Sequence, residues 1–200
     1  MPMLSLEPAT SDMSRLLRGI PDEILGWVTP NPGYKLGDLV DHVGGIALAF
    51  AASAAKDMGP LTGPARVGDA AHLGTDWRTA IPRDLAALAA AWDDPSAWTG
   101  ATQAGGLDLP AGVAAVVGLT ELIVHGWDIA VASGQRLHPD QDELTAVHGF
   151  LAQVRFDDPA AAGGFGPVVA VSAERPLLDQ VIGLSGRDPD WRPPPEAPAS

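Results

Sequence analysis

A glutamate and a histidine stand four positions apart in the segment Glu121-Leu122-Ile123-Val124-His125. On an α-helix, residues at i and i+4 lie one above the other on the same face, about 6 Å apart. This spacing allows one helix to give two ligands to one metal ion. The residues around the pair are mostly aliphatic, so the helix is expected to be buried, where a glutamate is costly unless it is paired or coordinated.

A second histidine, His42, lies in another apolar stripe, three residues after Leu39 and four before Ile46. It is therefore expected to face the interior as well. With Glu121 and His125 it would offer one oxygen and two nitrogen donors, a set that suits Zn²⁺, with Ni²⁺, Fe²⁺ and Mn²⁺ as alternatives. Three protein ligands leave positions open for water or substrate, as in catalytic rather than structural metal sites.

Each half of this pattern also has an ordinary interpretation. A single histidine on an apolar helix face is more often a hydrogen-bonded core residue, and a Glu–His pair at i and i+4 is more often a surface or capping interaction. Neither signal is specific alone. Their joint occurrence on two apolar faces makes a metal site as plausible as a buried polar network.

Further polar residues lie close to these ligands in sequence or are candidates for anion binding. Asp128, one turn after His125, is interpreted as a partner that orients the imidazole or, as the weaker alternative, as a general base. The chain lacks the HExxH pattern, in which a glutamate base accompanies two zinc histidines, so a hydrolase would need such a base. Arg155 and Arg187 could bind an anion, but pairing of Arg187 with Asp188, or a role in fixing the C-terminal segment, is favoured.

The hydrophobic periodicity predicts a mainly α protein, an up-down four-helix bundle with a small mixed C-terminal segment. The expected helices cover residues 8–27 (interrupted at Pro21), 36–57, 77–92 and 110–133, with shorter helices over 140–154 and 176–184. A short β segment is expected over 166–171, and a strand or an irregular crossover before Pro110. We expect residues 1–155 to form the bundle, 156–190 a small α+β extension packed on it, and 191–200 a disordered tail.

Composition narrows the class of protein further. The formal charge is −13 and the 12 basic residues are scattered, which disfavours nucleic-acid binding. The apolar stretch 109–133 is interrupted by Glu121, His125 and Asp128, so no membrane span is expected. The first residues do not resemble a signal peptide, and a cytoplasmic location is expected. With no cysteine in the chain, any thiol chemistry needs a thiol from outside. The excess of Arg over Lys, with abundant Ala, Gly and Pro, suggests an actinobacterial source.

Four blocks of sequence resemble a known family: TPNPGYKLGDLVDHVGG, ELIVHGWDIAVASGQ, FGPVVAV and LLDQVIGLSGRDP. They are similar to actinobacterial metal-binding proteins related to the mycothiol-dependent maleylpyruvate isomerases, in the DinB-like superfamily of four-helix bundles. The resemblance covers nearly the whole chain and implies that His42, Glu121 and His125 are the metal ligands. This chain has Asn31-Pro32-Gly33-Tyr34 where the family tends to have Cys-Pro-Asp/Glu-Trp, which is expected to change the mouth of the site.

The resemblance also implies a function. Members with known activity use mycothiol or a related low-molecular-weight thiol, so a thiol-dependent S-transferase or isomerase acting on a small molecule is the first expectation. The alternative is a non-catalytic bundle that binds a small molecule or senses metal, and a metallohydrolase is a third, weaker hypothesis. Whether the protein is an enzyme is left open, and a monomer and a homodimer are equally compatible with the sequence.

Overall fold

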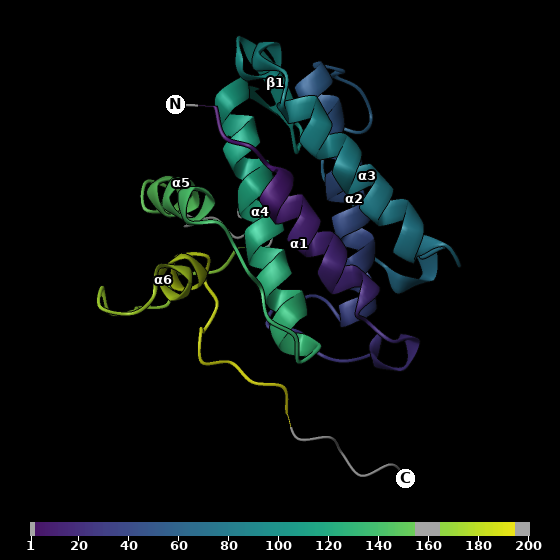
Figure 1. The fold of residues 1–200 in the computed structure, drawn as a ribbon, viewed down its shortest axis with the longest axis vertical. Helices are drawn as coiled ribbons and strands as arrows, with labels where there is room; N and C mark the ends of the chain where they lie inside the picture. Colours follow the sequence, from purple (N-terminus) through teal and green to yellow (C-terminus); the bar gives the residue numbers. More distant parts are fainter. Residues whose placement is uncertain (1–2, 155–164, 195–200) are drawn as a thin grey trace.

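The computed structural model describes residues 3–154 and 165–194. Within them, four helices form a bundle (Figure 1): α1 (Glu7–Arg18), α2 (Leu36–Ala55), α3 (Trp77–Trp92) and α4 (Ala111–Ala132). Two shorter helices, α5 (Gln141–Leu151) and α6 (Leu177–Leu184), follow. A hairpin of two antiparallel strands, β1 (Ala101–Ala104) and β2 (Leu107–Pro110), joins α3 to α4. The predicted mainly α class is confirmed, and of the two alternatives expected before Pro110, a strand or an irregular crossover, the structure has strands, paired as this hairpin.

The helices begin and end close to the prolines and glycines of the sequence. The predicted bounds of α3 agree with the structure, and α4 begins directly after Pro110 and ends just before Gly134. The first predicted helix is shorter than expected. It ends at Arg18, and a 3₁₀ turn, Asp22–Ile24, follows Pro21. Proline has no amide hydrogen to donate to the helix and constrains the residue before it, so the interruption at Pro21 is as predicted.

The directions of the helices differ from a simple up-down order. Gly44 of α2 faces Ile81 of α3, and further along both helices the Trp92 indole donates a hydrogen bond to the Phe50 carbonyl at 3.0 Å. The two helices therefore run parallel, which requires the long connection over 56–76 to return along α2. On the other side, α2 and α4 are antiparallel, since Phe50 packs on Gly118 and His42 lies near His125.

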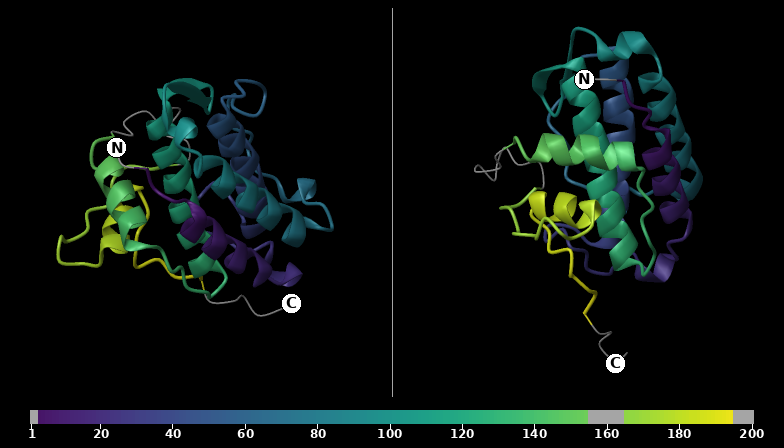
Figure 2. Two further views of the ribbon diagram at one scale, coloured as in Figure 1. Left: turned by 45° about the horizontal axis from the view of Figure 1, so that its top comes forward. Right: turned by 60° about the vertical axis from the view of Figure 1, so that its left-hand side comes forward.

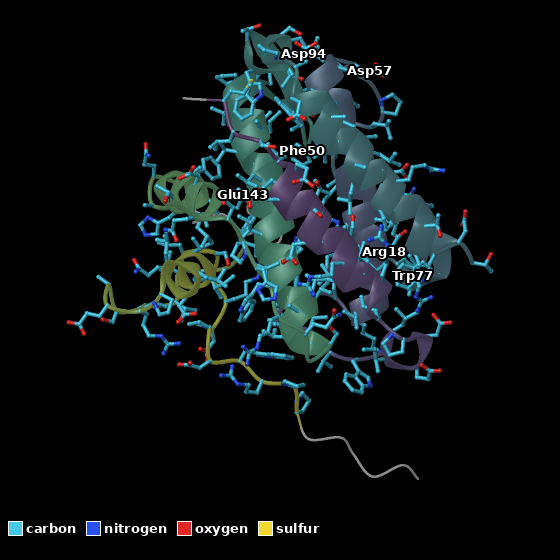
Figure 3. All side chains as sticks on the ribbon, in the orientation of Figure 1. Arg18, Phe50, Asp57, Trp77, Asp94 and Glu143 are labelled. Atoms are coloured by element: carbon cyan, nitrogen blue, oxygen red, sulfur yellow. The ribbon has the colours of Figure 1, made fainter. Side chains whose placement is uncertain are left out.

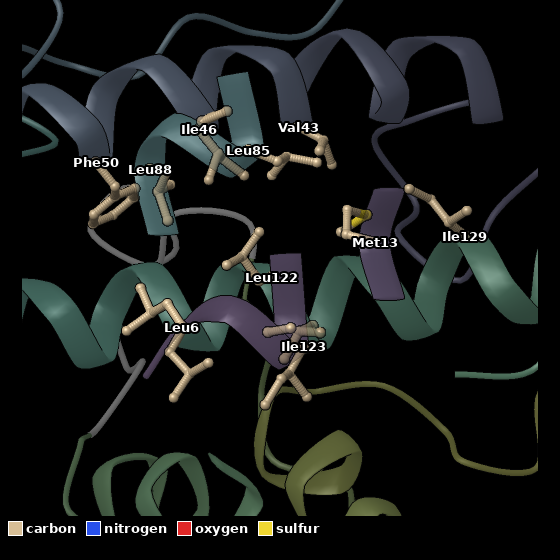
Figure 4. Close-up of a cluster of buried hydrophobic side chains, with 14 of the residues drawn as sticks. Leu6, Met13, Val43, Ile46, Phe50, Leu85, Leu88, Leu122, Ile123 and Ile129 are labelled. Atoms are coloured by element: carbon tan, nitrogen blue, oxygen red, sulfur yellow. The ribbon is translucent and has the colours of Figure 1, made fainter. Parts of the chain in front are cut away.

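Aliphatic and aromatic side chains from all four helices fill the space between them (Figure 4). Leu122 of α4 points toward Val43 and Ile46 of α2, with Leu85 of α3 close by, whereas Ile123 points away from α2. Burying each such side chain stabilises the fold by about 1.5–3 kcal/mol. Both α2 and α4 are long and apolar enough to span a membrane by length and composition alone, but most of α4 is buried within the bundle. A core helix of a protein folded in water has the same properties.

The C-terminal helices lie across the bundle rather than along it. In the right-hand view of Figure 2, α5 and α6 cross the face of α4 at a steep angle. The β segment predicted over 166–171 is wrong: within the described residues this stretch forms no strand, and the Val169 amide donates to the Gly183 carbonyl in α6 at 2.9 Å instead. The predicted division at residues 155 and 190 stays a prediction; Arg155 and the tail beyond 194 lie outside the described residues.

Candidate metal centre

Helix α4 positions two of the three predicted ligands. Glu121 and His125 project from the same face, as their spacing predicts, and the helix that carries them packs against α1, α2 and α5. Glu121 is 8% exposed and His125 only 1% exposed. A polar pair at this depth requires partners, because an unsatisfied buried carboxylate or imidazole costs free energy.

Helix α2 brings the third ligand, His42, to the same point. The start of this helix is fixed by Asp38, whose carboxylate accepts hydrogen bonds from the Lys35 amide at 3.0 Å and the Ala70 amide at 2.9 Å. The connection that follows α2 thus lies against its first turns. Gly68 comes so close that a Cβ there would be 3.0 Å from the Cβ of His42. The backbone around His42 is therefore held from two directions.

The three side chains converge. The Nε2 atom of His125 lies 3.0 Å from Oε2 of Glu121, and Nε2 of His42 lies 3.8 Å from the same oxygen. The two imidazole rings meet edge to face with centroids 5.1 Å apart. Among the described residues, this is the one cluster of three or more His, Cys, Asp or Glu residues whose donor atoms lie within 4.8 Å of one another.

Two of these converging atoms have no hydrogen-bond partner. Across the described residues, buried polar side-chain atoms without a partner are confined to Asn31 Nδ2, Glu121 Oε2 and His125 Nε2. The last two lie 3.0 Å apart, but no hydrogen bond joins them. Buried polar atoms nearly always have a bonding partner. Glu121 Oε2 and His125 Nε2 therefore suit a partner that accepts an electron pair from each of them. A divalent cation with nitrogen and oxygen ligands has this property.

The electrostatics of the cluster agree with this fit. Burial alone raises the pKa of Glu121, but the nearby imidazoles of His125 and His42 outweigh it and lower the pKa to about 2. Burial alone lowers the pKa of His125, but the carboxylates of Asp128 and Glu121 outweigh it and raise the pKa to about 9. The site thus favours a positive charge beside Glu121, and a bound cation would take the place of the imidazolium proton.

Behind His125 lies a second buried carboxylate. Oδ2 of Asp128 is 3.0 Å from Nδ1 of His125, and Asp128 has no exposed surface. The guanidinium of Arg187 completes the arrangement, with Nη2 at 3.2 Å from Oδ2 and Nε at 3.4 Å from Oδ1. The sequence left two structural roles open for Arg187, pairing with Asp188 or fixing the C-terminal segment; its carboxylate partner is Asp128 instead of Asp188, and through this contact it ties the C-terminal segment to α4. The signal that could have found the actual pair is Asp128 itself, since a carboxylate in so apolar a helix needs a buried counter-charge.

The loop before α2 lies on the His42 side of the cluster. The ring of Tyr34 lies 5.3 Å from that of His42, and its hydroxyl accepts a hydrogen bond from the Gly68 amide at 3.2 Å. Asn31, in the same loop, is buried with its amide nitrogen unpaired. The segment in which this chain departs from the family pattern therefore contacts the side of the site formed by α2.

The remaining histidines stay apart from the cluster. His72 lies 3.5 Å from Asp41 at the surface, and the backbone amide of His138 donates a hydrogen bond to the carboxylate of Asp12 at 2.6 Å. His148 lines a shallow groove between α5 and the extended segment before α6. Trp127 is buried, as expected for a packing residue. None of these joins a group of potential ligands within the described part of the chain.

The fold and the converging trio place the protein in the class of DinB-like helical bundles. Residues 6–130 match the family model described as the mycothiol maleylpyruvate isomerase N-terminal domain, so the chain belongs to this family. Two solved structures are similar in fold: the mycothiol-dependent maleylpyruvate isomerase and a histidine-to-alanine mutant of it. Each has 20% sequence identity and a TM-score of 0.57, over 76% of this chain and 70% of the other. A search of curated proteins found no match.

Proposed function

We propose that the protein binds one divalent metal ion through His42, Glu121 and His125 and uses it in a reaction that depends on a low-molecular-weight thiol. The observation that carries the proposal is the pair of buried, unpartnered donor atoms, Glu121 Oε2 and His125 Nε2, with His42 Nε2 beside them. Zinc is the expected metal, with nickel, iron and manganese as alternatives.

The family supports a thiol as the second component. Its described members include a mycothiol-dependent isomerase, and this chain has no cysteine of its own. An ordinary thiol has a pKa near ~8.5, so little thiolate is present at neutral pH. A bound divalent metal would coordinate the sulfur and favour the thiolate form at neutral pH. The reaction class that follows is isomerisation, in which a thiolate adds to a double bond and is released again after rotation about the resulting single bond, or S-transfer to a small electrophile whose leaving group departs.

The chain's own residues have separate tasks in this proposal. His42, Glu121 and His125 bind the metal and leave open the coordination positions that a thiol needs. Asp128 accepts the Nδ1 hydrogen of His125, which leaves Nε2 free to coordinate. This geometry favours an orienting role for Asp128 over the role of a base, because its other oxygen is occupied by Arg187 and it has no exposed surface.

Metal content is the first test. Untagged wild-type protein is expected to carry about one equivalent of zinc or another divalent metal, measured by elemental analysis after dialysis. His42→Ala, Glu121→Ala and His125→Ala should each lose it while keeping their helical circular dichroism. His148→Ala is the matched control and should retain the metal. A folded wild type that binds no metal when offered any of the four would overturn the proposal.

The thiol is tested separately, on protein loaded with cobalt. Addition of mycothiol, or of a simpler thiol as a stand-in, should produce a sulfur-to-cobalt charge-transfer band that is absent in Glu121→Ala. Loading with metal but no spectral change with any thiol would reject the thiol-dependent reaction and leave a metal-binding bundle. The cytoplasmic location, the actinobacterial source and the oligomeric state, monomer or homodimer, stay predictions from the sequence.

A further inference from the structure

Arg187 is the one residue of the C-terminal region, 165–194, whose side chain reaches the buried carboxylate behind the metal site in the described structure. It is 4% exposed and contacts both oxygens of Asp128 side-on, through Nη2 at 3.2 Å and Nε at 3.4 Å. The same Asp128 oxygen that meets Nη2 lies 3.0 Å from Nδ1 of His125. Arginine, aspartate and the proposed ligand thus form one continuous buried chain.

The turn after α6 fixes the direction of this arginine. Gly186 adopts a φ of +84°, and a Cβ there would come within 2.6 Å of the Gly166 backbone, so the turn requires glycine. The Arg187 amide donates back to the Ile182 carbonyl at 3.1 Å, and its Nη1 donates to the Ser185 carbonyl at 2.9 Å. The ring of Phe165 lies 5.5 Å from the guanidinium carbon. These contacts direct both the backbone and the side chain of Arg187 toward α4.

Charge explains why this contact matters for the ligand. A carboxylate with no exposed surface is stable only beside a counter-charge, and removal of one partner of a buried pair leaves the other uncompensated. Guanidinium is always charged and its planar fork matches the two oxygens of a carboxylate. Without Arg187, the carboxylate of Asp128 is no longer held in position. The hydrogen bond to Asp128 then no longer fixes the orientation of the His125 ring.

We propose that Arg187 is a positioning residue for the metal centre, which couples docking of the C-terminal region to metal affinity through Asp128 and His125. The inference rests on the proposed metal binding. It extends the site beyond residues 6–130, the part that matches the family model. Coupling between two binding events is reciprocal, so bound metal should hold the C-terminal region against the bundle as strongly as that region favours the metal.

Zinc affinity is the first readout, measured by competition with a chromophoric chelator and independent of catalytic activity. Arg187→Gln should bind zinc about 10–100-fold more weakly than wild type, the usual effect of losing a partner that orients a ligand. Arg187→Lys keeps the charge but not the fork and should fall between them. Arg175→Gln is the matched control: Arg175 lies in the same region, pairs with Asp179 and Asp190, and is 41% exposed. It should bind within about threefold of wild type.

Protease protection is the second readout. Zinc should slow cleavage within 165–187 in wild type and in Arg175→Gln, and have a much smaller effect in Arg187→Gln. If Arg187→Gln does not fold, Arg187→Lys decides the matter, alone and combined with Asp128→Asn. In the Asp128→Asn background the lysine substitution should cost far less zinc affinity than in wild type.

The outcomes separate the two proposals. A wild type that binds no zinc overturns the proposed function and this inference with it. A wild type that binds zinc, together with folded Arg187 variants of unchanged affinity and unchanged zinc protection, overturns this inference alone. Equal losses in Arg187→Gln and Arg175→Gln would also overturn it, since they would show general loosening of the region rather than a contact with Asp128.

Discussion

The two sides of the candidate metal centre are built differently. On the side of α4, His125 is 1% exposed and its Nδ1 is held by Asp128, which is held in turn by Arg187. On the side of α2, the His42 side chain is 12% exposed and lies beside the rings of Tyr34 and His125 and the carboxylate of Glu121. One candidate ligand is fixed by buried charge, the other by packing near a loop. The more exposed side of the candidate centre is therefore the side of α2.

The largest effect should come from breaking the buried charge on the α4 side. Asp128→Ala leaves Arg187 without its buried partner and is expected to cost about 3–5 kcal/mol of unfolding free energy. The matched control is Asp41→Ala on α2, where the carboxylate is 24% exposed and accepts the Asp69 amide at 3.0 Å. Its loss should cost about 1 kcal/mol. Urea denaturation measures both, and equal costs would contradict the contrast between the two sides.

The closeness of α2 and α4 gives a second, smaller test. A Cβ on Gly118 of α4 would lie 2.8 Å from the ring of Phe50 on α2, so Gly118→Ala should push these helices apart and cost about 1–3 kcal/mol. A Cβ on Gly45, on the open face of α2, would meet nothing within 4 Å. Gly45→Ala should therefore stabilise the helix by about 0.5–1 kcal/mol. Thermal unfolding of the two variants should shift in opposite directions, and shifts of the same sign would refute the packing argument.

The smallest effect concerns pH and the other buried anchor of the C-terminal helices. Glu143 lies on α5 at the side facing the bundle (Figure 3). It accepts a hydrogen bond from the Ala9 amide in α1 at 2.9 Å, and its described hydrogen bonds include no basic side chain. Burial raises its pKa to about 7; the amides of Ala9 and Asp140 oppose this rise, and the charges of Asp140 and Glu7 add to it. Unlike Asp128, this carboxylate is anchored by amides alone.

The sign of the pH dependence follows from that shift. The folded protein holds the Glu143 proton more tightly than the unfolded chain, so its contribution to stability is present at low pH and is lost as pH rises from about 4.5 to about 7. Between pH 5 and 8, the urea midpoint of wild type should fall more than that of Glu143→Gln. Asp142→Asn, which removes an exposed carboxylate from the same turn, should behave as wild type. Parallel curves for wild type and Glu143→Gln would rule out this source of pH dependence.

Sequence patterns predicted the bundle well because its signals are local. The stripe of α2 and the proline and glycine that bound α4 depend on neighbours within a few turns, and the Glu121–His125 spacing is itself a helical repeat. Convergence of His42 on that pair needed only that two apolar faces pack together. The expected strand over 166–171 failed because extended, β-branched residues need a partner strand, and here the Gly183 carbonyl of α6 takes the Val169 hydrogen bond.

The contacts that no local pattern contains were missed. Arg187 and Asp128 are 59 positions apart, and nothing near the arginine distinguishes a buried partner in α4 from the adjacent Asp188. The parallel packing of α2 and α3 was missed for the same reason, because helical periodicity does not show whether two neighbouring helices run parallel or antiparallel. The depth of Asp128 in an aliphatic helix was the usable clue, because it requires a counter-charge from somewhere else in the chain.

That separation of 59 positions also sets an order of events while the chain is being made. Chains emerge from the ribosome N-terminus first, so His42, Glu121, His125 and Asp128 are all available before Arg187 is. The four bundle helices can pack once α4 has emerged, with the ligands together but the aspartate still without its counter-charge. On the proposed coupling, an ion bound at that stage would be held more weakly than in the finished protein. Once α6 and the turn after it have emerged, Arg187 can pair with Asp128. The buried charge behind His125 would therefore be balanced only at that late stage of synthesis.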